Sequence, residues 1–188
     1  MTVGDEIRDI YENRATKQYG LSDVNQQQHA LQAAAFAEAQ GESPALIVAA
    51  LVHDIGHMVH DLGEDPASAG IDDKHEALGA VWLAMHFGPD VTEPVRLHVP
   101  AKRYLCAVDP TYFSKLSEDS VVSLGLQGGP MSPAEVQDFL SNPFAQAAVR
   151  LRLLDEAAKD PMAKTPSVAH FITYVDQVLA RTSRAGAA

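Results

Sequence analysis

The chain has 188 residues, of which 46% are hydrophobic, and a formal net charge of -11 at pH 7. This length and composition suit one globular domain with a substantial buried core, and the acidic balance, with no basic tract, argues against non-specific nucleic-acid binding. The single cysteine, Cys106, excludes an internal disulfide framework and a metal cluster held by several thiolates.

Helix-forming patterns run through the whole sequence. In chain order, the predicted helices cover residues 5–14, 26–40, 45–59, 73–87, 91–98, 132–140, 143–159 and 165–181. Two start signals support this division: Ser43-Pro44 combines an N-cap with a first-turn proline, and Ser132 opens a capping box. Residues 61–71 are expected to form a surface loop, and residues 99–129 a less regular segment.

The sequence shows neither sustained strand-type alternation nor an internal repeat. We therefore predict one all-α domain over residues 1–188, with a core from about residue 5 to 181 and a mobile tail over 182–188. The N-terminus lacks the pattern of a secretory signal, and the apolar stretches are too short to cross a bilayer. We expect a cytoplasmic enzyme with no nucleic-acid or membrane partner; the sequence leaves the oligomeric state open.

An adjacent histidine and aspartate, His53-Asp54, lie inside the apolar stretch predicted as helix 45–59. A buried imidazole needs a partner for each ring nitrogen, and a buried carboxylate is costly unless it is paired or metal-bound. The pair therefore favours a metal site over an accident of core packing. The complete predicted ligand set is His29, His53, Asp54, His75, His98 and Asp155. Imidazole and carboxylate ligands suit iron, manganese or zinc.

The outer members of this set also have ordinary interpretations. His29 alone is compatible with a surface position, His75 with a polar helix start, and His98 with a helix end or loop. Asp155 follows an apolar run, where an unpaired carboxylate would be costly. Helical bundles build metal sites from side chains that project inward from several helices, so the six residues together favour a site.

His57 lies four residues after His53, so the two share one face if the predicted helix is continuous. Asp54 can turn to the same centre, and its two carboxylate oxygens can bridge two cations.

Seven segments of the chain resemble the HD-domain superfamily, most of whose members are phosphohydrolases. They are YG (19–20), QHALQ (28–32), HDIGH (53–57), KHE (74–76), HVPAKRYL (98–105), LQGGPM (126–131) and RLRLLD (150–155). The resemblance is closer to the PhnZ-like branch, the mixed-valent di-iron oxygenases that cleave carbon–phosphorus bonds. HVPAKRYL and LQGGPM are much more specific to that branch than the HD pair. The resemblance covers residues 19–160 and implies an HD-domain helical bundle with a di-metal site at its centre.

The same resemblance implies two iron ions, Fe(II) and Fe(III), with O2 as co-substrate. One iron would be held by His29, His53, Asp54 and Asp155. The other would be held by His75 and His98, with Asp54 bridging. Tyr19 matches a residue that caps the second iron until substrate displaces it, although a core aromatic is an even alternative.

The anion-binding positions of the family match His57, Lys102 and Arg152 in this chain. Ser120 is a weaker candidate for a contact to a phosphonate oxygen, and Gln127 is weaker still. Each cation also has an ordinary interpretation. Arg152 could form a helical salt bridge to a glutamate four residues later, and Lys102 could belong to a solvated pair.

One departure from the family bears on the substrate. Relatives that act on a primary amine carry an acidic residue three positions after the tyrosine, where this chain has Ser22; Asp23 could substitute only after a one-residue shift. A quaternary ammonium offers no N–H donor and needs no such acid. The resemblance therefore favours 1-hydroxy-2-(trimethylammonio)ethylphosphonate, cleaved to glycine betaine and phosphate.

Three alternatives remain open from the sequence. The first is the same chemistry on 2-amino-1-hydroxyethylphosphonate, which gives glycine and phosphate. The second is a metal-dependent phosphohydrolase, in which a metal-bound hydroxide attacks phosphorus without dioxygen. The third is a catalytically silent HD module that acts in binding or assembly.

Overall fold

The computed structural model describes residues 2–16, 23–59 and 72–185, which are mainly helical and contain no β-strand. In chain order the elements are α1 (Val3–Asp9), the π-helical turn η1 (Ile10–Arg14), α2 (Gln26–Ala39), α3 (Pro44–Val52), the 3-10 helix η2 (Ile55–Met58), α4 (His75–Ala84), α5 (Pro89–Val108), α6 (Pro110–Phe113), α7 (Glu118–Leu126), α8 (Pro133–Ser141), α9 (Ala145–Ala157) and α10 (Val168–Ala185). The predicted all-α fold is confirmed. None of the described helices is both long enough and apolar enough to cross a membrane.

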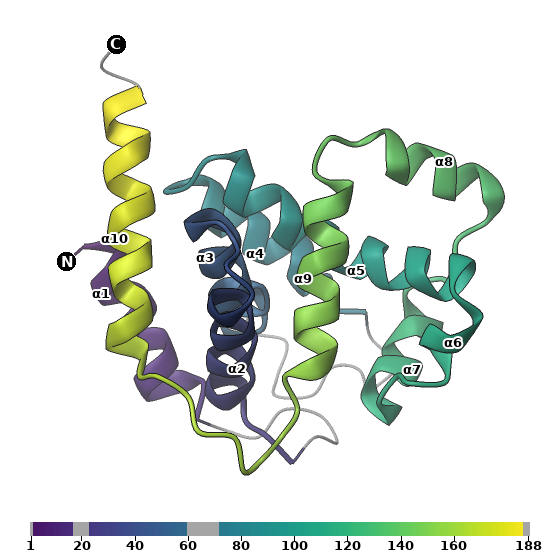
Figure 1. The fold of residues 1–188 in the computed structure, drawn as a ribbon, viewed down its shortest axis with the longest axis horizontal. Coiled ribbons are helices and arrows are strands. Elements are labelled where there is room, and N and C mark those ends of the chain that lie inside the picture. Colours follow the sequence, from purple (N-terminus) through teal and green to yellow (C-terminus); the bar gives the residue numbers. More distant parts are fainter. Residues whose placement is uncertain (1, 17–22, 60–71, 186–188) are drawn as a thin grey trace.

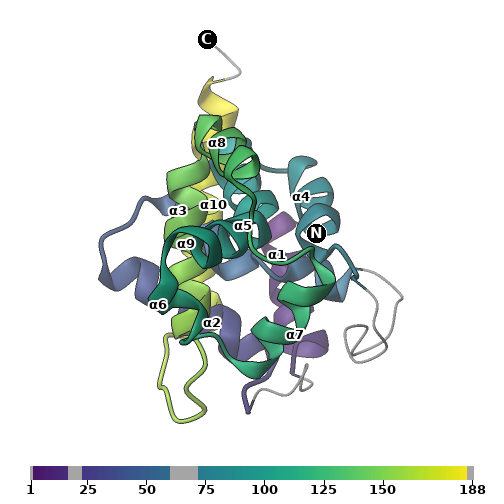
Figure 2. The same ribbon diagram turned by 90° about the vertical axis from the view of Figure 1, so that its right-hand side faces the viewer.

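Helices α2, α3 and α9 form the middle of the molecule. Figure 1 shows α10 and α1 on one side of them and α6, α7 and α8 on the other. In the perpendicular view, α5 runs between α9 and α4 (Figure 2), and it packs closely on both. Because α2 packs on α3 and α9, and α5 packs on α3 and α9, these four helices meet at the centre of the fold.

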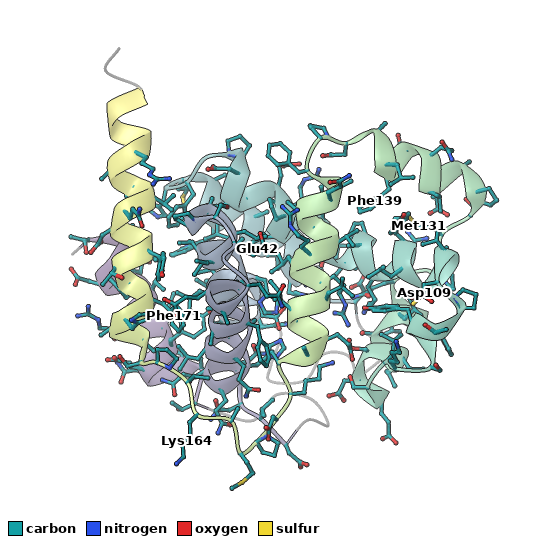
Figure 3. The ribbon with its side chains drawn as sticks, in the orientation of Figure 1. Glu42, Asp109, Met131, Phe139, Lys164 and Phe171 are labelled. Atoms are coloured by element: carbon teal, nitrogen blue, oxygen red, sulfur yellow. The ribbon has the colours of Figure 1, made fainter. Side chains whose placement is uncertain are left out.

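Two clusters of buried hydrophobic side chains hold these helices together. The larger core cluster joins α1, η1, α2, α3, α9 and α10, and Phe171 projects from α10 into it (Figure 3). A smaller cluster joins α5, α8 and α9 around Phe139, with Met131 packed against it (Figure 3). The Tyr11 hydroxyl donates a 2.5 Å hydrogen bond to the main-chain carbonyl of Leu51, inside the larger core. This bond ties η1 to the last turn of α3, two residues before His53.

The segment around His53 departs from the prediction of one helix over residues 45–59. Helix α3 ends at Val52, His53 is its C-cap residue, and the chain then turns into η2. The turn is possible because Gly56 lies against the main chain at the start of α4: a Cβ there would lie 1.9 Å from the carbonyl oxygen of His75. The expectation that His53 and His57 share one helical face was therefore wrong.

The segment predicted as irregular, residues 99–129, is also mostly helical. Helix α5 continues through Pro94 and Pro100 to Val108, and α6 and α7 follow it. Each proline removes one main-chain donor, but the inward face of α5 is buried against α4 and α9 along its length. Packing of that face offsets the lost hydrogen bonds, so His98 lies within a helix and not at its end.

The predicted ends of the chain differ from the structure in smaller ways. The helix predicted over residues 5–14 is divided into α1 and η1, and α10 continues to Ala185, into the segment predicted as a tail. Residues 61–71, predicted as a surface loop, lie outside the described residues, as do residues 186–188.

Candidate metal centre

Five segments bring the six predicted ligands close together where α2, α3, α5 and α9 meet. His29 lies in the first turns of α2, His53 and Asp54 follow α3, and His75 begins α4. His98 lies in the middle of α5 and Asp155 near the end of α9. All four histidines and Asp155 are buried, and the side chain of Asp54 is 13% exposed. Their potential ligand atoms form two clusters that could each hold a metal ion.

The first cluster contains His29, His53 and Asp155. The Nε2 atoms of the two histidines lie 3.1 Å apart. An Asp155 carboxylate oxygen lies 3.2 Å from Nε2 of His29 and 3.8 Å from Nε2 of His53.

The second cluster contains His75, His98 and Asp54. The Nε2 atoms of its two histidines lie 3.2 Å apart. The Oδ1 atom of Asp54 is 3.6 Å from each of these nitrogens. The same carboxylate lies 3.5 Å from Nε2 of His53 and 3.6 Å from Nε2 of His29, so Asp54 faces both clusters.

The tautomers of the four histidines fit a cation in each cluster. Nδ1 of His29, His53 and His98 lies 2.9, 2.9 and 2.7 Å from the main-chain carbonyls of Ala158, Ala50 and Val95. Nδ1 of His75 lies 2.9 Å from a carboxylate oxygen of Asp73. Because carbonyls and carboxylates accept hydrogen bonds, each Nδ1 carries the proton and each Nε2 presents a lone pair. Two facing lone pairs in each cluster are mutually repulsive unless a cation lies between them.

Burial and neighbouring charge act on these groups in opposite directions. Burial, followed by the neighbouring His75, lowers the pKa of His98 to about 3, which favours its neutral, metal-binding form. Burial raises the pKa of the Asp155 carboxyl, but the Arg152 guanidinium together with His29 and His53 outweighs it, so the net pKa is lowered. Burial likewise opposes ionisation of Asp54, and the surrounding histidines, led by His53, reverse this and lower its pKa. The carboxylates are thus ionised and able to bind a metal.

Asp73 and His57 lie beside the second cluster. Nδ1 of His57 lies 2.6 Å from Oδ2 of Asp73, while Oδ1 of Asp73 accepts from His75. The rings of His57 and His75 are stacked, with centroids 3.9 Å apart. We did not single out Asp73 in the sequence; the only available signal was its position two residues before a predicted ligand.

A group of cations and hydroxyls surrounds the other side of Asp155. Arg152 donates to Asp155 at 2.5 Å, to the Tyr112 hydroxyl at 2.8 Å and to Ser120 at 3.1 Å, and it also pairs with Glu156. The salt bridge considered from the sequence is therefore present, but it is buried and not on the surface.

Lys159 completes this group, and no motif in the sequence pointed to it. Its ammonium donates to Ser117 at 2.7 Å, to Ser120 at 3.2 Å and to Glu156 at 3.0 Å.

Lys102 is the cation of this region with unmatched charge. It is only 3% exposed, and its ammonium donates a 2.8 Å hydrogen bond to the neutral hydroxyl of Ser123. No carboxylate in the described part of the chain forms an ion pair with it. A buried ammonium without a counter-ion is costly, so this position is suited to an incoming anion.

The remaining predicted residues lie apart from these contacts or outside the description. Tyr19 and Ser22 lie outside the described residues, and Asp23 is exposed. The amide oxygen of Gln127 is buried and has no hydrogen-bond partner among the described residues.

The HD-domain family model matches residues 27–105, which include five of the six predicted ligands. The chain is 42% identical over 173 residues to a 1-hydroxy-2-(trimethylamino)ethylphosphonate dioxygenase (glycine-betaine-forming) from Leisingera caerulea, covering 92% of this chain and 88% of that protein. It is also 42% identical over 181 residues to a hydroxymethylphosphonate dioxygenase from Gimesia maris, covering 95% of this chain and 90% of the relative.

Proposed function

Because this chain belongs to the family of HD-domain phosphonate dioxygenases, we propose that it uses O2 to cleave the carbon–phosphorus bond of 1-hydroxy-2-(trimethylammonio)ethylphosphonate. The products are glycine betaine and phosphate. The pairs of facing histidine nitrogens, with buried Lys102 nearby, are the structural observation that carries this proposal.

The reaction balances without a further reductant. The C–P bond and the C1–H bond of the substrate break, and C1 becomes a carboxyl carbon. The carboxylic acid and phosphoric acid together contain two oxygen atoms more than the hydroxyphosphonate, which is one O2.

The residues of the two clusters would hold a pair of iron ions, Fe(II) and Fe(III). His29, His53 and Asp155 would supply ligands for one and His75 and His98 for the other, and the Asp54 carboxylate, which faces both clusters, would serve both. When bound, this metal pair supplies the redox chemistry by which O2 oxidises the substrate carbon. The main-chain carbonyls behind His29, His53 and His98 hold each ring with Nε2 directed inward. Tyr19 would cap the second iron before substrate enters.

In this proposal, His57 and residues near Asp155 bind the substrate. Lys102 supplies a buried charge for the phosphonate, and Ser120 and His57 supply further polar contacts. Arg152 has a different part in this proposal. Its hydrogen bonds are directed to Asp155, Tyr112, Ser120 and Glu156, so it holds Asp155 in place and offers little of its donor capacity to substrate.

The group at the end of the substrate opposite the phosphonate distinguishes the substrates of different members of this family. Ser22 stands where relatives that act on a primary amine have an acid, which favours a quaternary ammonium over 2-amino-1-hydroxyethylphosphonate. Hydroxymethylphosphonate is the second candidate, because the relative that acts on it is as similar to this chain as the glycine-betaine-forming one.

Steady-state oxygen uptake with these three hydroxyphosphonates tests the substrate assignment. We expect the highest kcat/KM with the trimethylammonio compound, together with glycine betaine as the carbon product. A clear preference for the primary amine or for hydroxymethylphosphonate contradicts the assignment while leaving the oxygenase chemistry intact.

Replacing Lys102 by methionine tests the anion site. Charge-assisted hydrogen bonds contribute about 1.5–3 kcal/mol, so we expect kcat/KM for the phosphonate to fall by roughly 10–100-fold. Lys115→Met removes an exposed charge and is the matched control, with kcat/KM unchanged. Equal kcat/KM in Lys102→Met and the wild-type protein would show that this ammonium does not bind substrate.

The pH profile provides a second measurement on Lys102. Burial, and then the charge of Arg152, lower the pKa of Lys102 to about 7. The substrate-free protein loses this positive charge as pH rises through that value, and kcat/KM reports groups of the free enzyme. We therefore expect kcat/KM to fall above about pH 7 in the wild-type protein, and this limb to be absent in Lys102→Met.

A further inference from the structure

Asp73 connects a predicted metal ligand to a predicted substrate contact. Its Oδ1 atom lies 2.9 Å from Nδ1 of His75, and its Oδ2 atom lies 2.6 Å from Nδ1 of His57. Asp73 is 8% exposed, and the two imidazole rings that it contacts are stacked on each other. One carboxylate thus fixes two stacked histidines that serve different parts of the proposed reaction.

The tautomers follow from this arrangement. A carboxylate oxygen is an acceptor, so each Nδ1 carries a proton and each ring presents Nε2 to its other neighbours. Nε2 of His75 is the atom that faces His98 at 3.2 Å in the second cluster. His57, held in the same way, reaches any further partner through Nε2.

The main chain next to Asp73 adopts an unfavourable conformation that accompanies the placement of its carboxylate. Lys74, between Asp73 and His75, has a positive φ of 51°, a conformation that costs free energy for a residue with a side chain. That conformation lets Oδ1 of Asp73 also accept from the main-chain N–H of His75 at 3.2 Å. Helix α4 begins at His75, so the strained residue Lys74 lies next to the carboxylate that contacts both histidines.

We propose that Asp73 is a positioning residue that sets the orientation of His75 toward the second metal and of His57 toward the phosphonate. The inference rests on the proposed function and deepens it, because it couples metal binding at one cluster to substrate binding. It differs from a helix-capping role, which needs only an acceptor for the His75 N–H.

Asp73→Asn separates the two roles. Asparagine caps helices as well as aspartate does, so it can keep the hydrogen bond to the main chain. Because Oδ1 of Asp73 accepts from both the main-chain N–H and Nδ1 of His75, that amide oxygen also keeps the contact to the His75 ring, and the amide NH2 faces the Nδ1 proton of His57. Asp73→Ser removes both ring contacts: its hydroxyl can still cap the main chain, but its side chain is too short to reach the rings. Asp72→Asn is the matched control: it makes the same change one residue earlier, where the carboxylate only weakly accepts from the Lys74 N–H at 3.4 Å.

Anaerobic titration with Fe(II), followed by measurement of iron bound per chain, is the direct test. Loss of a hydrogen-bond partner behind a metal ligand lowers metal affinity by about 10–100-fold. We expect Asp73→Ser to retain iron at the first cluster and to lose it selectively at the second, so that bound iron falls from two equivalents toward one, while Asp73→Asn keeps both irons. The KM for phosphonate should rise in both variants, and Asp72→Asn should match the wild-type protein on both measurements.

Several results overturn the inference. Asp73→Ser with wild-type iron content and wild-type KM excludes a positioning role, and equal loss at both clusters indicates a general structural one. Should Asp73→Ser fail to fold, Asp73→Glu carries the test, because it keeps the charge and displaces the carboxylate by one methylene. Wild-type iron affinity in that variant overturns the inference, and selective loss of one iron supports it.

The iron measurement is independent of turnover. A wild-type protein that binds two irons but takes up no oxygen with any hydroxyphosphonate contradicts the proposed function, whereas the iron content of the Asp73 variants still tests the positioning of His75.

Discussion

Asp54→Asn is expected to abolish oxygen-dependent turnover, with kcat at least about 10³-fold lower, because bound metal ions contribute several kcal/mol to catalysis. Asp54 is the residue that faces both clusters, with its carboxylate 3.5–3.6 Å from Nε2 of His29, His53, His75 and His98. An asparagine has one acceptor oxygen and no charge, so it cannot bridge two cations. We expect the variant to fold and to bind fewer than two irons per chain.

Bound iron, melting temperature and oxygen uptake are to be measured together on the same preparation. Asp138→Asn, an exposed position on α8, controls for loss of one negative charge and should behave as the wild-type protein. An Asp54→Asn variant with two bound irons and undiminished turnover would rule out a bridging role for this carboxylate.

Gly56→Ala should give the second large effect, on stability as well as on the site. The added Cβ would lie 1.9 Å from the carbonyl oxygen of His75 and 2.9 Å from its Cα, so main chain must move against main chain. Overpacking of this kind costs about 3 kcal/mol or more, equivalent to a fall in Tm of roughly 6–12 °C at this chain length. The displaced segment begins α4, so we also expect weaker metal binding at the cluster of His75 and His98.

Thermal unfolding of the metal-free protein isolates the packing effect, and Fe(II) titration then measures the site. Gly125→Ala is the control, since a Cβ at that helical position meets no atom within 4 Å and should leave Tm unchanged or higher. Equal Tm values for Gly56→Ala and the wild-type protein would mean that η2 and α4 do not pack as closely as described.

The sequence was sufficient for the all-α fold and for the set of residues that meet at its centre. The reason is physical: histidines and aspartates in apolar helical segments are costly unless they meet one another or a metal, so their positions point inward. The serine N-cap at Ser43 and the capping box at Ser132 were likewise readable, because capping is decided by residues within one turn.

What sequence reasoning missed depends on contacts between distant segments. The end of α3 at Val52 follows from the approach of Gly56 to the main chain of His75, and the full length of α5 follows from packing that offsets two prolines. Asp73 and Lys159 were not identified as parts of the site for the same reason. Their partners, such as His57 and Ser117, lie 16 and 42 residues away and are met only in the folded chain.

Oxygen consumption measured together with phosphate release tests the central claim most directly. The iron-loaded protein, supplied with 1-hydroxy-2-(trimethylammonio)ethylphosphonate, should consume one O2 for each phosphate released and should release no phosphate under anaerobic conditions. Phosphate release that continues without oxygen would contradict this claim, because it would indicate hydrolysis by a metal-dependent phosphohydrolase. The absence of both oxygen consumption and phosphate release with every hydroxyphosphonate would also contradict it.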